Sequence, residues 1–214
     1  VVITSYHDDR LLGASYFKEK GVKIIAAGNV PALIKTHKSV YDRILKHFPK
    51  DLIKDTKIVN PDILVDKEYI IKGDKKSLFI YKPSKATQSP ADMIVYSPKD
   101  SFIFAGNTIF NGRFVNYASD SSMEGWIKAL DFIKDKKAKF VLGGHGREYD
   151  AHSYKMTLDY LLMLRKQVKA AYEKDIDPAD LDKNVHTDAF KKIPHYNELY
   201  MRNARNYFDQ LEWQ

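Results

Sequence analysis

Three short loops constrain this chain most, because each of them directly follows an apolar run. The run VVIT leads into SYHDDR at 5–10, SFIF leads into AGN at 105–107, and FVL leads into GGHG at 143–146. In layered α/β folds, binding and catalytic residues lie in loops at the ends of strands. These three loops therefore form the candidate functional site.

The remainder of the chain alternates between helical and strand patterns. Residues 11–21 predict a helix closed by Gly21, then a strand at 22–27 and a second helix from Asn29 to about Phe48. Five β-branched and aromatic runs between 57 and 104 predict an antiparallel meander: KIVN, EYIIKG, KSLFIYKP, DMIVYSP and SFIFAGN. Helices are expected at 121–136, at 151–174 and twice in the tail, which makes residues 1–214 one α/β (α+β) domain.

Composition limits the function classes. The 214 residues include 35 Lys+Arg and 28 Asp+Glu, but the basic residues are scattered, which favours a solvated lysine-rich surface and no nucleic-acid partner. No stretch is long and apolar enough for a membrane span. The absence of cysteine excludes disulfides, thiolate zinc sites and cysteine nucleophiles, and it leaves both the periplasm and the cytoplasm open.

Two of the loops carry histidines with the chemistry of a site. His7 and Asp9 alternate along an extended loop, a spacing that delivers an imidazole and a carboxylate to one metal ion or proton-transfer centre. The alternative is a solvated surface turn. The glycines around His145 allow close backbone approach to its imidazole, and the alternative there is a tight turn with a hydrogen-bonded histidine.

In this order and spacing, the loops resemble the metallo-β-lactamase superfamily, whose first loop reads HxHxDH. The segment FAGNTIFNGR with Trp126 downstream, and the terminal helix YMRNARNYF, are most similar to the quinoprotein relay system zinc metallohydrolases. The resemblance covers nearly the whole chain. It implies an αββα four-layer sandwich, with 151–214 as a helical tail packed on it, and a periplasmic location, with the cytoplasm as the alternative.

Carried over residue by residue, the resemblance implies an eroded dinuclear zinc site. Four family ligands are replaced by weak or cationic groups: Ser5, Arg10, Gln88 and Asn107. Three positions keep the family's residue: His7, Asp9 and His145. The implied remnant pocket consists of Ser5, Tyr6, Arg10, Gln88, Asn107 and Arg113.

The substitutions leave three functions open. Because Arg10 repels a dication and Asn107 lacks the charge that holds a hydroxide, the first is a non-catalytic pseudoenzyme that binds a small molecule or a protein in the remnant pocket. The second is a hydrolase with one zinc ion on His7, Asp9 and His145, in which Asp9 serves catalysis. The third is an anion-binding protein that uses Arg10, although this guanidinium could instead pair with Asp9.

Other residues near the loops have expected supporting roles. We expect Arg113 to brace its loop against Asp120 in preference to orienting a substrate, and Tyr6, Tyr117 and Tyr149 to line the pocket.

The resemblance also implies strands before the HxHxDH strand that are not among these 214 residues. An unpaired VVIT edge would be prone to aggregate, so we expect a separate N-terminal segment or a second chain to complete the sheet.

Overall fold

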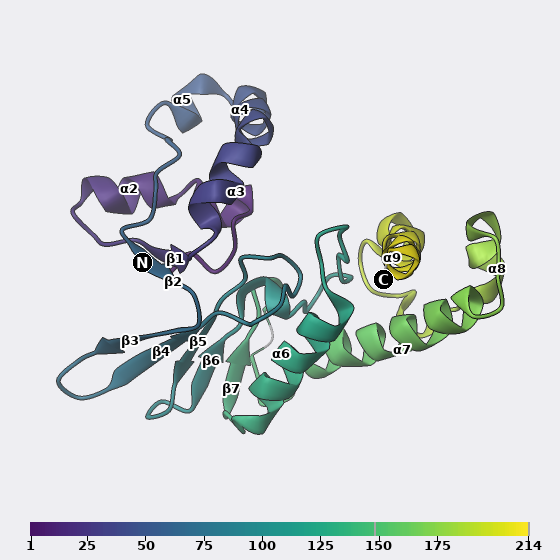
Figure 1. Ribbon diagram of the computed structural model, residues 1–214. Helices are drawn as coiled ribbons and strands as arrows, with labels where there is room; N and C mark the ends of the chain where they lie inside the picture. The colour runs from purple at the N-terminus through teal and green to yellow at the C-terminus, as the bar shows by residue number, and fades with distance from the viewer. Residues whose placement is uncertain (148, 214) are drawn as a thin grey trace.

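The computed structural model describes residues 1–147 and 149–213 and contains two sheets (Figure 1). In the small sheet, β1 (Ile25–Ala27) pairs in parallel with β2 (Ile63–Val65), and Val2 bridges to Ile25 on the other side. The large sheet has the order β3 (Glu68–Lys72), β4 (Ser77–Tyr81), β5 (Ile94–Ser97), β6 (Phe102–Phe104) and β7 (Phe140–Leu142). Its pairs are antiparallel except for β6 with β7.

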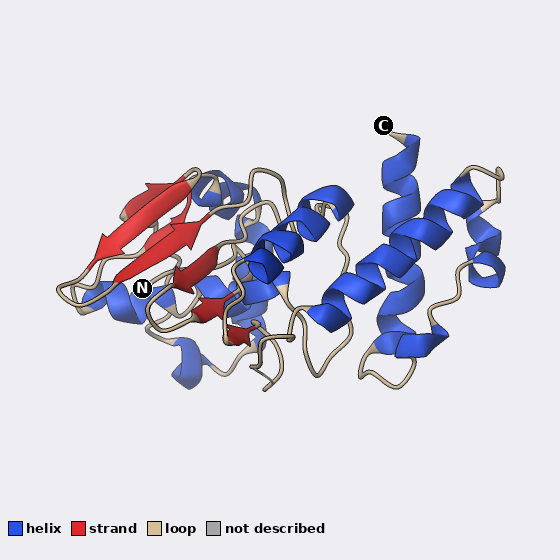
Figure 2. Ribbon diagram, turned by 90° about the horizontal axis from the view of Figure 1, so that it is seen from below, coloured by secondary structure: helices blue, strands red, loops and turns tan. Residues whose placement is uncertain are grey.

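Helices cover both sheets and extend beyond the large one. The first group is α1 (Asp8–Leu11), α2 (Ala14–Glu19), α3 (Val30–Thr36), α4 (Lys38–His47) and α5 (Lys50–Ile53), of which α2 to α5 gather on the side of the small sheet (Figure 1). The second group is α6 (Met123–Asp135), α7 (Lys155–Tyr172), α8 (Leu181–Asn184) and α9 (Tyr196–Glu212). Figure 2 shows α6 between the strands and the helices of the tail.

The large sheet separates two apolar cores because neighbouring residues of a strand point to opposite faces. Ile80 and Val95 face the core shared with the small sheet and its helices. Tyr81 and Ile94 face the second core, which continues through Trp126 on α6 to α7 and α9. The succession of helices, small sheet, large sheet and helices is the αββα sandwich that the sequence predicted.

The meander is confirmed for four of the five predicted strands, which are β3 to β6. The prediction of a strand at KIVN is wrong. Ile58 and Val59 pack against the first core outside any strand, and β2 begins instead at Ile63, whose backbone N–H donates to the Ile24 carbonyl. A strand in this place depends on β1, a partner far away in sequence, and the local pattern does not reveal it.

Two predicted helices are each divided. Residues 11–21 contain the end of α1 and then α2, with Gly13 as the residue before α2. The helix expected from Asn29 to Phe48 is α3 and α4, and it is interrupted at His37. Thr36 donates to the Ala32 carbonyl at 3.3 Å and the His37 ring nitrogen lies 3.0 Å from the Leu33 carbonyl, so side chains compete here for the helical acceptors.

The first residues are paired within the described chain. The Ile3 N–H donates to the Ile25 carbonyl and the Met93 N–H donates to the Thr4 carbonyl, and both Ile3 and Thr4 are buried. The completion of this sheet by another segment stays a prediction. Within 1–147 and 149–213, no helix has the length and apolarity needed to cross a membrane, and the compartment also stays a prediction.

Candidate functional site

The three loops meet at one pocket of about 260 Å³. Its lining comes from all three loops and from two further segments, and it comprises His7, Asp8, Asp9, Gln88, Asn107, Phe110, Arg113, Asn116 and His145. Six of these are residues that the sequence singled out. Ser5, Tyr6 and Arg10 do not line the pocket but lie beneath it, where Ser5 is fully buried.

Residues Asp8–Leu11 of this segment form the helix α1, so the prediction of an extended loop is wrong, although His7 and Asp9 both line the same pocket. The backbone N–H groups of Arg10 and Leu11 donate to the His7 carbonyl at 3.0 and 2.9 Å, which makes His7 the residue that precedes α1. Arg10, three residues after His7, turns toward Asn107 and Gly144, to which it donates hydrogen bonds.

The Arg10 guanidinium joins the three loops. Its Nη2 donates to the Gly144 carbonyl at 2.7 Å and to Asn107 Oδ1 at 3.1 Å. The predicted pair with Asp9 is present, with Nη1 at 3.5 Å from Oδ2. A permanent cation thus fills the space between the first loop, the AGN loop and the GGHG loop.

Arg10 also determines which nitrogen of His7 carries a proton. Because a guanidinium only donates, Asn107 must present its oxygen to Arg10 and its NH₂ group to the other side. There Asn107 Nδ2 lies 3.2 Å from His7 Nδ1 and 3.5 Å from Gln88 Oε1. An amide nitrogen cannot accept, so His7 Nδ1 accepts and a neutral His7 carries its proton on Nε2.

His145 sits in the glycine-rich loop as the sequence suggested. Its ring stacks on Phe110 with centroids 4.7 Å apart, and the loop is joined to the 110–111 backbone by a bridge between Phe110 and His145. Burial, and then the positive charges of Arg113 and Arg10, lower the pKa of His145 to about 4. The imidazole is therefore neutral near pH 7.

The expected pairing of Arg113 with Asp120 is wrong. Asp120 accepts a hydrogen bond of 2.8 Å from the Tyr6 hydroxyl, whereas the Arg113 guanidinium lies 5.9 Å from the Phe110 ring and lines the pocket. Burial, together with this hydrogen bond to Asp120, raises the pKa of Tyr6 well above its usual value. The tyrosine holds two segments together beneath the site.

The expectation that three tyrosines line the pocket is also wrong. Tyr6 lies beneath it, Tyr117 is fully buried against Trp126, and Tyr149 is exposed beside Phe140. Tyrosines are common in this chain and fill core positions as readily as pocket positions.

Sequence reasoning missed one buried carboxylate beside the site. Asp92 is 2 % exposed and accepts from the Ser89 backbone N–H at 2.6 Å, the Ser89 hydroxyl at 2.8 Å and the Thr87 hydroxyl. Burial raises its pKa, and these bonds counter the shift. The signal was an aspartate directly before the apolar run MIVY. Its role here is to shape the loop that carries Gln88 into the pocket.

The side chains at the site do not provide the ligands that the zinc ions implied by the fold would need. Within 1–147 and 149–213, no three His, Asp, Glu or Cys side chains are grouped so as to hold a metal ion. His7 Nδ1 is occupied by an amide donor, and a guanidinium lies between the first and last loops. A dication beside Arg10 would meet a like charge that cannot be removed by deprotonation.

Comparison with known proteins now identifies the fold family. The family model of the metallo-β-lactamase superfamily matches residues 1–145, which include every residue that lines the pocket. The chain belongs to the metallo-β-lactamase superfamily. The narrower resemblance to the quinoprotein relay branch stays a prediction.

Individual metallo-β-lactamase relatives are distant. A type 2 metallo-β-lactamase of Elizabethkingia meningoseptica is 23 % identical over 174 residues, which cover 79 % of this chain but 62 % of that protein. A metallo-β-lactamase from Pontibacter korlensis superposes with a TM-score of 0.59 at 21 % identity, covering 75 % of this chain and 67 % of the other. A stereoselective inverting sec-alkylsulfatase from a Pseudomonas species has a TM-score of 0.69 at 15 % identity, covering 98 % of this chain and 40 % of the other. These structural likenesses show a shared fold.

Proposed function

We propose that this chain is a non-hydrolytic metallo-β-lactamase-fold protein that binds a small polar ligand in the remnant pocket. The position of Arg10 carries the proposal, because its guanidinium lies in the site that would hold metal and donates hydrogen bonds there to Asn107 Oδ1 and the Gly144 carbonyl. Hydrolysis in this fold needs a metal-activated water, and a guanidinium supplies no open coordination position.

The ligand is proposed to carry an anionic group that faces Arg113. In contrast to the prediction from sequence, Arg10 donates inward and does not line the pocket, so Arg113 is the guanidinium that faces the cavity. Asn116 also lines the pocket. Its side-chain oxygen accepts a hydrogen bond of 2.7 Å from Arg202, which leaves the Asn116 NH₂ group as a donor. The polar lining and the volume of about 260 Å³ favour a small molecule over a protein partner.

Metal content tests the non-hydrolytic part of the proposal. Protein purified without chelator or immobilised-metal resin is analysed by inductively coupled plasma mass spectrometry, before and after incubation with zinc, manganese and iron. We expect no stoichiometric metal and no turnover of lactam, ester or sulfate-ester substrates. One bound equivalent that disappears in both His7→Ala and His145→Ala would instead establish the single-metal hydrolase.

Ligand binding is tested separately with inorganic phosphate, sulfate and acetate in isothermal titration calorimetry. We expect saturable binding to the wild-type protein that weakens as salt rises and is lost in Arg113→Gln. Arg205→Gln changes an exposed guanidinium on α9 and serves as the matched control. Equal loss in both variants, or no binding to the wild type, would refute the role of Arg113.

A further inference from the structure

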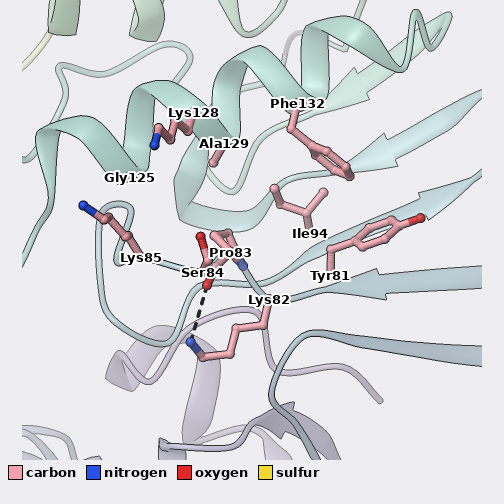
Figure 3. Close-up of a pocket in the computed structure, with 10 residues that line it drawn as sticks. All are labelled: Tyr81, Lys82, Pro83, Ser84, Lys85, Ile94, Gly125, Lys128, Ala129 and Phe132. Atoms are coloured by element: carbon pink, nitrogen blue, oxygen red, sulfur yellow. Dashed lines mark hydrogen bonds between the residues drawn. The ribbon is translucent and has the colours of Figure 1, made fainter.

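A second pocket lies between the end of β4 and the first turns of α6 (Figure 3). Its volume is about 220 Å³, and it shares no lining residue with the remnant pocket. The lining comes from β4 and the loop after it, the start of β5, and one side of α6: Tyr81, Lys82, Pro83, Ser84, Lys85, Ile94, Gly125, Lys128, Ala129 and Phe132. We call it the β4–α6 pocket.

The floor of the β4–α6 pocket is apolar. Ile94 and Ala129 belong to the second core, and Tyr81 and Phe132 meet edge to face with centroids 4.9 Å apart. Gly125 brings α6 close to the loop after β4, because a Cβ at this position would overlap the Ala86 carbonyl oxygen. A hydrocarbon body placed here would be removed from water on several sides.

The opening of the pocket is cationic at one end. Figure 3 shows Lys85 and Lys128 on the same side of the opening, away from Tyr81 and Phe132. Within the described residues, neither ammonium lies within 4.0 Å of a carboxylate, and the ammonium of Lys82 donates to the Pro83 carbonyl at 3.5 Å. Because these ammonium groups have no carboxylate partner in the described residues, a ligand with an anionic group would supply their counter-charge beside the apolar floor.

The aromatic end differs in its charges. Glu68 on β3 lies opposite Tyr81 in the β3–β4 register. Burial of the Tyr81 hydroxyl raises its pKa, and the negative charge of Glu68 raises it further. Lys136 makes cation–π contacts at this end, with its Nζ 4.6 Å from the Phe132 ring centroid and 5.3 Å from that of Tyr81. The carboxylate of Glu68 and the ammonium of Lys136 offset each other at the aromatic end, whereas Lys85 and Lys128 face no carboxylate among the described residues, so an anionic group is attracted to the end with Lys85 and Lys128.

We propose that the β4–α6 pocket binds an amphipathic organic anion, with its hydrocarbon body against Ile94, Ala129 and Phe132 and its carboxylate or sulfate group between Lys85 and Lys128. The volume is below the range typical of drug-sized ligands, so the body is a chain of medium length. The proposal is independent of the remnant pocket, because the two cavities are lined by different residues.

Isothermal titration calorimetry with octanoate, octylamine and acetate tests the proposal. In the Arg113→Gln variant, which lacks the anion site proposed for the remnant pocket, we expect saturable binding of octanoate alone, since octylamine has the wrong charge and acetate lacks the hydrocarbon chain. Reversing both charges in Lys85→Glu/Lys128→Glu is expected to weaken octanoate binding about tenfold, because each exposed ion pair contributes modestly. Both lysines are exposed, so the fold is expected to tolerate this change.

The control variant is Lys134→Glu/Lys139→Glu, which changes the net charge equally at two exposed lysines outside the lining. It is expected to bind octanoate as the wild type does. The proposal is overturned if octanoate does not bind, if octylamine binds equally well, or if the control variant loses as much affinity. Loss of octanoate binding in Arg113→Gln would overturn it as well, because it would place the ligand in the remnant pocket.

Discussion

Replacing Arg10 by methionine tests whether the guanidinium holds the loops of the remnant site together. Methionine keeps most of the apolar stem but removes the donors to the Gly144 carbonyl at 2.7 Å and to Asn107 Oδ1 at 3.1 Å. A hydrogen bond from a charged donor is worth about 1.5–3 kcal/mol, and an acceptor left without a partner adds to the loss.

Solvent moderates this loss. The Arg10 side chain is 22 % exposed, so water can reach part of the space, and the pair with Asp9, which is 47 % exposed, contributes about 1 kcal/mol or less. We therefore expect Arg10→Met to lower the free energy of unfolding by about 2–4 kcal/mol.

Urea unfolding followed by tryptophan fluorescence measures the effect, because Trp126 is fully buried in the native state. The control is Arg205→Met, which removes an exposed guanidinium on α9 and is expected to change stability by about 0.5 kcal/mol or less. If Arg10→Met is no more destabilising than Arg205→Met, the guanidinium does not hold the loops, and the argument against a metal at this position fails with it.

Three further predictions concern individual groups. Asn107→Asp keeps an acceptor for Arg10 but removes the donor to His7, so the His7 proton is expected to move to Nδ1; an unchanged pattern of imidazole ¹⁵N shifts would contradict the hydrogen-bond chain. Burial and two arginines lower the pKa of His145 to about 4 in the native state, against an ordinary value of 6.5. The unfolded state therefore binds more protons between these pH values, and the free energy of unfolding should fall by up to about 3 kcal/mol as pH drops from 6.5 to 4. His145→Gln should remove this pH dependence from urea unfolding curves, and persistence of the full slope would show that another group titrates. Ser122→Ala removes the side-chain acceptor of the Gly125 N–H at the start of α6 and is expected to cost about 1 kcal/mol in the same assay, a value that a change near zero would refute.

The sequence predicted the features that local patterns determine. The loop that carries His7, the AGN loop and the GGHG loop do meet at one pocket, because each follows an apolar segment that pairs with a strand of a layered fold. The meander from β3 to β6 was predicted because period-two alternation and turn residues encode it locally.

Features that depend on distant partners could not be predicted in this way. Strand β2 exists because Ile63 pairs with Ile25, and the chain leaves the extended conformation directly after His7 because the His7 carbonyl accepts from the N–H groups of Arg10 and Leu11 in α1. The role of Arg113 was predicted wrongly for the same reason, since Tyr6, more than a hundred residues away along the chain, satisfies Asp120. Each of these outcomes is a competition between partners that only the folded chain brings together.

The substitutions at Arg10 and Asn107 depend on each other. Arg10 needs an oxygen acceptor at Asn107, and in accepting from Arg10 the Asn107 amide turns its NH₂ group toward His7. Restoring a carboxylate at 107 alone would strengthen its attraction to the guanidinium, which would still fill the site. Removing Arg10 alone would leave a neutral amide oxygen, which is a weak zinc ligand. Neither single change would return the ligand set that the family resemblance implies, so the proposed non-hydrolytic function depends on the pair and not on either residue by itself.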